Sequence, residues 1–121
     1  MKFKVLLVSV GVLVAIGLFS VILFEKEPLP LVVVIMTKQG FEPATFDVKK
    51  GQAVEFRNTS TDIHFWPASD LHPTHDIYPE FDPREPIAPG ESWTFVFKRK
   101  GTWKFHDHLR ASLRGTIQVL Q

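Results

Sequence analysis

Histidines are the residues of this chain best suited to chemistry, because five occur in 121 residues and four of them form two close pairs. A Pro-Thr dipeptide separates His72 from His75, and one aspartate separates His106 from His108. Neutral imidazole binds copper, zinc, iron and nickel, so two pairs that meet in space would make a metal site. The chain has no cysteine, which rules out disulfides, thiolate zinc sites and a blue copper centre, whose geometry depends on a thiolate.

The predicted strand over residues 103–108 sorts its side chains by alternation, since every second residue of a strand points to the same face. Phe105 and Asp107 share the face that aromatic residues mark as the core, whereas His106 and His108 share the opposite, outer face. Residues i and i+2 of a strand lie about 6.5–7 Å apart at Cα, which lets both imidazoles reach one ion.

The proline between the other two histidines stiffens their turn, so that both can face one point. Asp76, Glu80 and Asp82 lie in the same segment. Turn chemistry beside prolines explains these carboxylates, although one of them can complete a coordination sphere or orient an imidazole. We therefore predict an outer-face metal site, and the alternative is a set of solvated surface histidines. The predicted ligands are His72, His75, His106 and His108.

Short strand-like segments and glycine or proline turns follow one another from residue 31 onward. Strands are predicted over residues 31–36, 46–49, 53–58, 93–98, 103–108 and 116–120, and a turn over residues 40–43. Residues 67–90 hold most of the prolines and show no periodicity, which predicts a loop long enough to be functional or disordered. Many short strands with such turns favour a β-sandwich or a barrel.

The same landmarks resemble, in their order, those of the cupredoxins. They are Gly-Phe-Glu-Pro at 40–43, the strand pattern at 48–58, a histidine at 64, Pro-Gly-Glu-Ser at 89–92 and Gly-Thr-Trp at 101–103. The resemblance covers roughly residues 31–121. It implies an all-β fold, namely a Greek-key cupredoxin-like β-sandwich.

The resemblance also implies a second place for a metal, at one end of the sandwich. In the family register Cys-x-x-His-x-x-Met-x-Gly, Asp107 stands at the Cys position, Arg110 at the second His and Leu113 at Met, while His64 matches the first His. His64 and Asp107 are therefore further candidate ligands. The alternative is an ion pair between Asp107 and Arg110, since a guanidinium repels a metal ion.

The triplet His106-Asp107-His108 resembles the His-Cys-His triplet of multicopper oxidases with its Cys replaced. In those proteins the two histidines bind the oxygen-reducing copper cluster, on the face opposite the Cys. That cluster needs further domains, and this chain is long enough for one domain. We therefore carry over the pairing of the histidines and not the oxidase activity.

Residues 5–24 contain no charged side chain and are long enough to cross a hydrocarbon core of about 30 Å as a helix. Lys2 and Lys4 precede them, so the positive-inside rule places the rest of the chain outside the cytoplasm. We expect a transmembrane anchor (1–24), a linker (25–30) and one cupredoxin-like domain (31–121), held at the cell membrane by a single pass on the extracytoplasmic side. A cleaved signal peptide is the alternative, but its apolar region would be shorter.

The expected function is metal binding at a non-blue, histidine-based site, with copper favoured over zinc or another divalent ion, in storage, delivery or an accessory role. The expected partners are a metal ion, the membrane and a protein. A net charge of +1 gives no reason to expect nucleic acid. Two other functions stay open: a metal-free interaction module, and a small redox metalloenzyme. No nucleophile–base pair or phosphate-binding loop is present, so an enzyme would need a bound metal with an open position.

Overall fold

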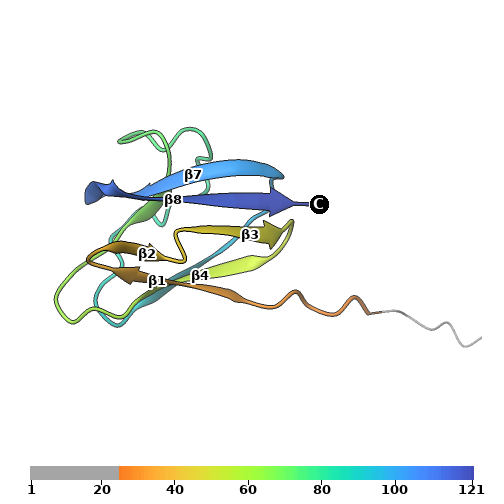
Figure 1. The fold of residues 1–121 in the computed structure, drawn as a ribbon, viewed down its shortest axis with the longest axis horizontal. Helices are drawn as coiled ribbons and strands as arrows, with labels where there is room; N and C mark the ends of the chain where they lie inside the picture. The colour runs from red at the N-terminus through yellow and green to blue at the C-terminus, as the bar shows by residue number, and fades with distance from the viewer. Residues whose placement is uncertain (1–24) are drawn as a thin grey trace, which may run out of the picture.

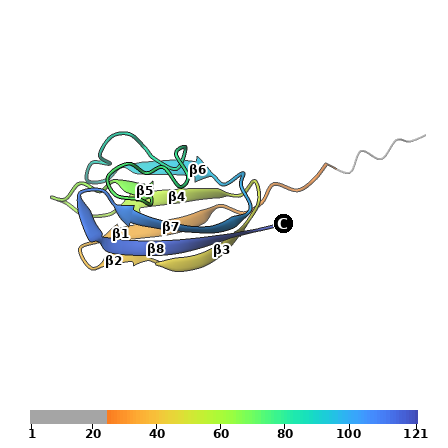
Figure 2. The same ribbon diagram turned by 90° about the horizontal axis from the view of Figure 1, so that it is seen from above.

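The computed structural model describes residues 25–121, and every regular element in this part of the chain is a β-strand (Figure 1). The strands are β1 (Val32–Thr37), β2 (Gly40–Glu42), β3 (Thr45–Lys49), β4 (Ala53–Asn58), β5 (Pro67–Ser69), β6 (Ser92–Val96), β7 (Gly101–Asp107) and β8 (Arg110–Leu120). They form two four-stranded sheets, ordered β2-β1-β4-β6 and β3-β8-β7-β5, which lie one over the other (Figure 2). The predicted all-β sandwich is confirmed.

No helix capable of crossing a membrane occurs among residues 25–121. The transmembrane segment predicted over residues 5–24 lies outside the described residues, so it stays a prediction.

Strand boundaries agree with the sequence pattern where alternation is clear and differ elsewhere. Residues 67–69, predicted as part of the long loop, form β5, because they pair antiparallel with β7. The predicted strand 53–58 is β4. Residues 40–43, predicted as a turn, instead contain β2, which pairs antiparallel with β1. The last strand begins at Arg110 rather than at residue 116, because β8 pairs with β7 in a tight hairpin in which Arg110 faces Asp107.

The core between the sheets is built mainly of aromatic rings. Phe56 and Phe105 come from opposite sheets, and their ring centroids are 5.8 Å apart. Phe81, from the loop between β5 and β6, is fully buried, and its ring stacks on Trp93 at 5.9 Å with the planes 5° apart. The loop therefore contributes directly to the core.

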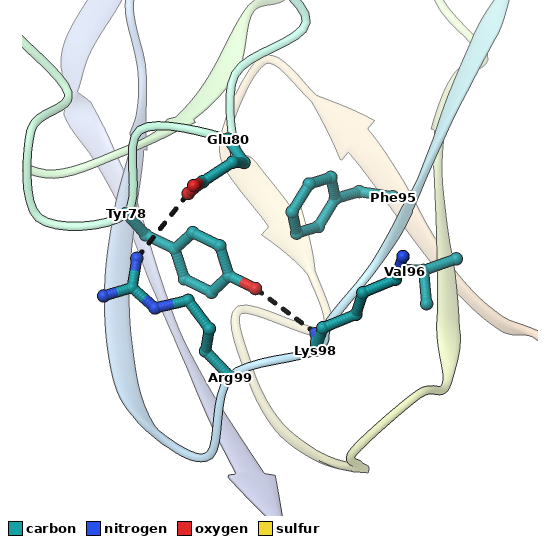
Figure 3. A pocket seen from close by; sticks show the side chains of 6 residues that line it. All are labelled: Tyr78, Glu80, Phe95, Val96, Lys98 and Arg99. Carbon is teal, nitrogen blue, oxygen red and sulfur yellow. Dashed lines mark hydrogen bonds and ion pairs between the residues drawn. The ribbon is translucent and has the colours of Figure 1, made fainter.

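The loop is also held along its length by hydrogen bonds. The N–H of Ser69 donates to the carbonyl oxygen of Phe81 (2.9 Å), and the N–H of Tyr78 donates to Oγ of Ser69 (2.9 Å). The hydroxyl of Tyr78 accepts the N–H of Lys98 (3.2 Å), and the Arg99 guanidinium lies 4.6 Å from the Tyr78 ring centroid (Figure 3). The segment predicted as a long loop is thus ordered by buried side chains on its inner side.

Gly115 lets β8 pass close to the core. It pairs with Phe105 of β7, and a Cβ added at Gly115 would overlap the Phe105 ring and lie 2.6 Å from the carbonyl oxygen of Ala44. Because Gly115 has no side chain, β8 can lie close both to the Phe105 ring and to Ala44, the residue before β3.

Candidate metal centre

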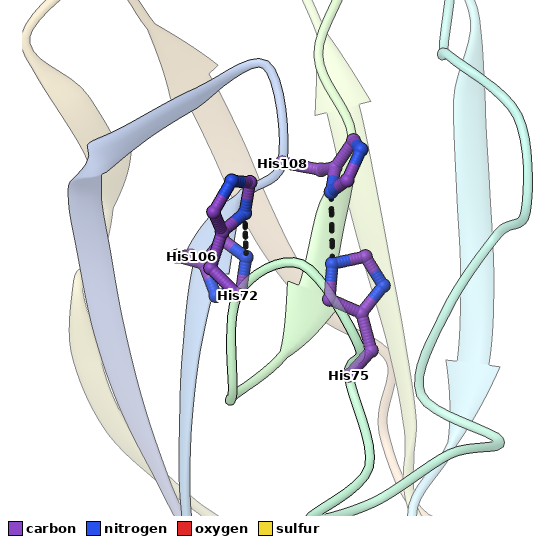
Figure 4. Close-up of side chains that lie close together, drawn as sticks. All are labelled: His72, His75, His106 and His108. Carbon is purple, nitrogen blue, oxygen red and sulfur yellow. Dashed lines mark hydrogen bonds between the residues drawn. The ribbon is translucent and has the colours of Figure 1, made fainter.

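Four imidazoles converge beside β7, and they are the four that the sequence assigned to the outer-face site (Figure 4). His72, His75, His106 and His108 each offer one ring nitrogen, and these atoms all lie within 4.8 Å of one another. Nδ1 of His72 is 3.2 Å from Nε2 of His106, and Nδ1 of His108 is 3.0 Å from Nε2 of His75. The two pairs predicted from spacing thus meet in space.

The end of β7 and the residue after it supply one pair of histidines, His106 and His108. Phe105 belongs to the hydrophobic core whereas His106 lies among the other histidines, as alternation predicted. His108 follows the strand, where its N–H donates to the carbonyl oxygen of Trp66 (2.7 Å). The expectation of an open outer face is wrong for His106, which is 0% exposed because the β5–β6 loop covers it, and His108 is half-buried.

A tight turn in the loop supplies the other pair. The N–H of His75 donates to the carbonyl oxygen of Leu71 (2.6 Å), and the N–H of Ile77 donates to that of Asp70 (2.9 Å). His75 has φ 56°, in the left-handed region that few residues other than glycine adopt and that is frequent at functional sites. His75 is buried and His72 is exposed, so the turn presents one ring to the interior and one to the solvent.

Two aspartates hold two of the imidazoles. Oδ1 of Asp70 accepts a hydrogen bond from Nδ1 of His106 (2.8 Å), and Oδ2 of Asp82 accepts one from Nδ1 of His75 (2.8 Å). An ionised carboxylate can only accept, so each of these rings carries a proton on Nδ1, and in the neutral form of the ring Nε2 keeps its lone pair. Contacts of this kind orient imidazole ligands and raise their basicity.

The two carboxylates are themselves fixed. Asp70 forms an ion pair with the guanidinium of Arg114. Oδ1 of Asp82 accepts Nε1–H of Trp66 (2.8 Å) and the backbone N–H of Arg84 (2.8 Å). Burial by itself raises the pKa of Asp82, but the hydrogen bonds that its carboxylate accepts outweigh burial and hold this pKa below its usual value. Asp82 is therefore a carboxylate at neutral pH.

These contacts define one arrangement of the ring protons when all four rings are neutral. Since Nε2 of His75 and of His106 carry lone pairs, Nδ1–H of His72 and of His108 donate to them. In this arrangement each ring carries one proton. Burial is the main cause that lowers the pKa of His106, opposed by Asp70, and burial with neighbouring histidines lowers the pKa of His108. A lowered pKa favours the neutral imidazole, which is the form that binds a metal ion.

The other candidate position, at the end of the sandwich, has a different structure. Oδ1 of Asp107 accepts the N–H of Trp66 (2.9 Å) and of Leu109 (3.2 Å), and Oδ2 lies 2.9 Å from Nη1 of Arg110. The predicted ion pair between Asp107 and Arg110 is confirmed. His64 is exposed, and its carbonyl oxygen accepts the same Arg110 guanidinium (2.9 Å). Among residues 25–121, neither His64 nor Asp107 joins the converging group.

Sequence reasoning did not find Asp70. It follows β5 and contacts His106 across 36 positions of the chain, a pairing that local spacing cannot reveal. Asp82 was one of three loop carboxylates considered for orienting an imidazole, and the structure assigns that contact to it alone among the three. The other two, Asp76 and Glu80, are exposed.

Two stacked sheets around an aromatic core, with a histidine cluster outside one sheet, define a β-sandwich with a candidate metal centre. A family model described as the cupredoxin-like domain matches residues 9–119. The chain belongs to the cupredoxin-like domain family, as the order of its landmarks implied. No curated protein matches the chain by sequence.

Solved structures with a similar fold include copper proteins. The Cu-containing nitrite reductase of Thermus scotoductus SA-01 aligns with TM-score 0.64 and 24% identity over 79% of this chain and 23% of that one. A reduced Cu(I) form of an amicyanin mutant aligns with TM-score 0.61 and 17% identity over 75% of this chain and 83% of that one. A mutant fern plastocyanin aligns with TM-score 0.59 and 20% identity over 73% and 99%. At these identities the alignments show the fold, and this chain spans less than a quarter of the nitrite reductase.

The donor atoms decide which metal chemistry fits this chain. A thiolate-ligated copper does not fit, because the chain has no cysteine and the Asp107 carboxylate is occupied by an arginine and two N–H groups. A nitrogen-ligated ion fits the histidine cluster, where four ring nitrogens converge. Their chemistry suits copper and zinc.

Proposed function

We propose that this domain binds a metal ion, preferably copper, at a non-blue centre made of His72, His75, His106 and His108, and that it stores or delivers the ion or serves an accessory role. The convergence of four ring nitrogens within 4.8 Å supports this proposal. The carboxylates of Asp70, which is buried, and Asp82, which is half-buried, lie behind two of the rings and support it further, because surface histidines without a ligand need no such partners.

Metal uptake by the full-length chain tests the proposal. We expect one copper per chain by elemental analysis, a weak d–d absorption for Cu(II), nitrogen hyperfine structure in the paramagnetic resonance spectrum, and no intense thiolate charge-transfer band. The double variant His106→Ala/His108→Ala should lose most of the affinity, and His64→Ala is the matched control that should keep it.

The outcomes separate the alternatives. If the double variant bound copper as tightly as the parent chain, the outer-face centre would be wrong and the position around His64 and Asp107 would replace it. If the parent chain took up copper only weakly and neither variant changed that uptake, a metal-free interaction module would be the better function. Turnover of a substrate only in the metal-loaded chain would favour a small redox metalloenzyme.

We further propose that residues 5–24 anchor the chain in the cell membrane with the domain outside the cytoplasm. The support is the uncharged run preceded by Lys2 and Lys4. The mature protein should fractionate with membranes and keep its original N-terminus. A soluble mature form that begins within or after this run would show cleavage of a signal peptide instead.

A further inference from the structure

The four imidazoles are of two kinds. His75 and His106 are 4% and 0% exposed, and each has Nδ1 bound to an aspartate at 2.8 Å. His72 is exposed and His108 is half-buried, and within residues 25–121 neither ring has a carboxylate within hydrogen-bond distance. Their Nδ1 atoms instead contact Nε2 of the other two rings. We call His75 and His106 the anchored pair, and His72 and His108 the open pair.

The anchored pair is preorganised for metal binding in the metal-free chain. Its protons are held on Nδ1 by Asp70 and Asp82, so both Nε2 lone pairs face the cluster without any change of tautomer. Each aspartate is fixed in turn, by Arg114 in one case and by Trp66 in the other. These rings can neither turn away nor lose their orientation without breaking the hydrogen bonds to Asp70 and Asp82.

The open pair must change before it can bind. Its Nδ1 atoms are nearest to the other rings, and in the neutral arrangement described above they carry the protons. To give Nδ1 lone pairs to an ion, both rings must lose that proton and gain one on Nε2. The number of protons in the cluster stays the same, and the access of these two rings to solvent allows the exchange.

We infer, on the basis of the proposed function, that the cluster is a two-part centre in which the anchored pair retains the ion and the open pair exchanges it. The ion enters and leaves on the side of His72, where an external nitrogen or oxygen donor takes the place of that ring. Asp70 and Asp82 are positioning residues that act through His106 and His75. The step is a ligand exchange and involves no electron transfer.

Aspartate variants of the full-length chain test the anchored half. Asp82→Asn and Asp70→Asn should weaken Cu(II) binding by about 10–100-fold, the usual effect of removing the carboxylate behind a ligating histidine. Asp76→Asn is the matched control, because it makes the same charge change on an exposed residue of the same loop. Equal affinities for Asp82→Asn, Asp76→Asn and the parent chain would overturn the inference.

Nitrogen-15 spectra of the imidazoles report the tautomer of each ring, which would not change on metal binding if the aspartates and histidines had only a structural role. His75 and His106 should carry the proton on Nδ1 both in the metal-free chain and with diamagnetic Zn²⁺ bound. His72 and His108 should change from the Nδ1–H to the Nε2–H form when Zn²⁺ binds. Finding all four rings in one unchanging tautomer would contradict the two-part centre, and this measurement needs no variant to fold.

Transfer of Cu(II) from the loaded chain to excess EDTA tests the open half. His72→Ala should speed transfer and weaken binding less than His75→Ala does. The reverse order would overturn the assignment of the exchange side. If the parent chain took up neither copper nor zinc, the proposed function itself would fail, whereas uptake with the aspartate variants unchanged would defeat this inference alone.

Discussion

His106 and His108 stand two residues apart and offer nitrogens to the same cluster, yet their surroundings differ. His106 is fully buried and bound to Asp70, whereas His108 is half-buried and packs on the Trp66 ring, with 4.6 Å between ring centroids. Removing a buried partner leaves the other group unsatisfied, which costs about 1–3 kcal/mol. Substitution of His106 should therefore change the stability of the fold more than substitution of His108.

We predict that His106→Ala lowers the free energy of unfolding of the metal-free chain by about 1–3 kcal/mol, because it leaves the buried Asp70 carboxylate with one partner fewer. His108→Ala should cost less stability, although both variants lose metal affinity. Denaturant unfolding of the metal-free chains measures the difference. Equal stability of His106→Ala and the parent chain would show that the His106–Asp70 contact contributes nothing to the fold.

Among the described elements, the loop between β5 and β6 is the one that couples the core to the candidate metal centre. Its outer turn carries His72 and His75, and its inner side places Tyr78 and Phe81 in the core. The Phe81 ring lies 5.0 Å from Phe97 and 5.6 Å from Phe105, measured between ring centroids. The position of the two loop ligands therefore depends on aromatic packing below them.

We predict that Phe81→Ala lowers the free energy of unfolding by about 3–5 kcal/mol, as is usual for removing a buried aromatic ring. It should also weaken metal binding, since the loop loses its support. Ile77→Ala, in the same loop but 46% exposed, is the control and should change stability by less than about 0.5 kcal/mol. Phe81→Leu should show a smaller loss in the same direction.

The opposite result would be informative as well. If Phe81→Ala unfolded at a lower denaturant concentration but bound copper with the parent affinity, the histidine turn would be held by its own hydrogen bonds. The contacts of His75 with Leu71 and Asp82 would then suffice to fix it.

The sequence predicted those elements in which local pattern decides structure. Alternation placed β4 at its observed bounds and put His106 and Phe105 on opposite faces. The pairing of histidines at short spacing identified the cluster for the same reason. Such signals lie within a few residues of the chain, where strand geometry alone fixes which side chains are neighbours.

Contacts between distant segments escaped prediction. The Asp70–His106 bond joins residues 36 positions apart, and no spacing rule connects them. The early start of β8 also escaped, because the family register suggests a ligand loop there whereas the Asp107–Arg110 ion pair closes a hairpin. The burial of His106 depends on a loop that is distant in the sequence, so it too could not be seen in the strand.

At the scale of the whole molecule, two histidines with lowered pKa values make the stability of the metal-free domain depend on pH. The folded chain lowers the pKa of His106 and His108, chiefly by burial, whereas in the unfolded chain these groups have pKa values near 6.5. Below about pH 6.5 the unfolded chain therefore binds more protons than the folded chain. Stability from these groups is complete above that pH and is lost as the pH falls through the folded values.

We predict that the free energy of unfolding of the metal-free chain falls between about pH 7 and pH 5, as linkage to the two lowered histidine pKa values requires. Denaturant unfolding over this range measures the fall, and His108→Ala should make it shallower. Metal affinity should decline over the same range, because protons and metal compete for the ring nitrogens. A stability that stays constant or rises on acidification would contradict the prediction.

The shared role of the β5–β6 loop also bears on how long the protein survives in a cell. A ligand that binds only the folded state stabilises that state by an amount that grows with the free ligand concentration. Proteases cut segments that open locally. Opening of the β5–β6 loop would remove Tyr78 and Phe81 from the core and two candidate ligands from the histidine cluster. Under the proposed function, turnover of the protein should therefore follow the supply of the metal ion, so that the abundance of the protein rises when the ion is plentiful without any change in its rate of synthesis.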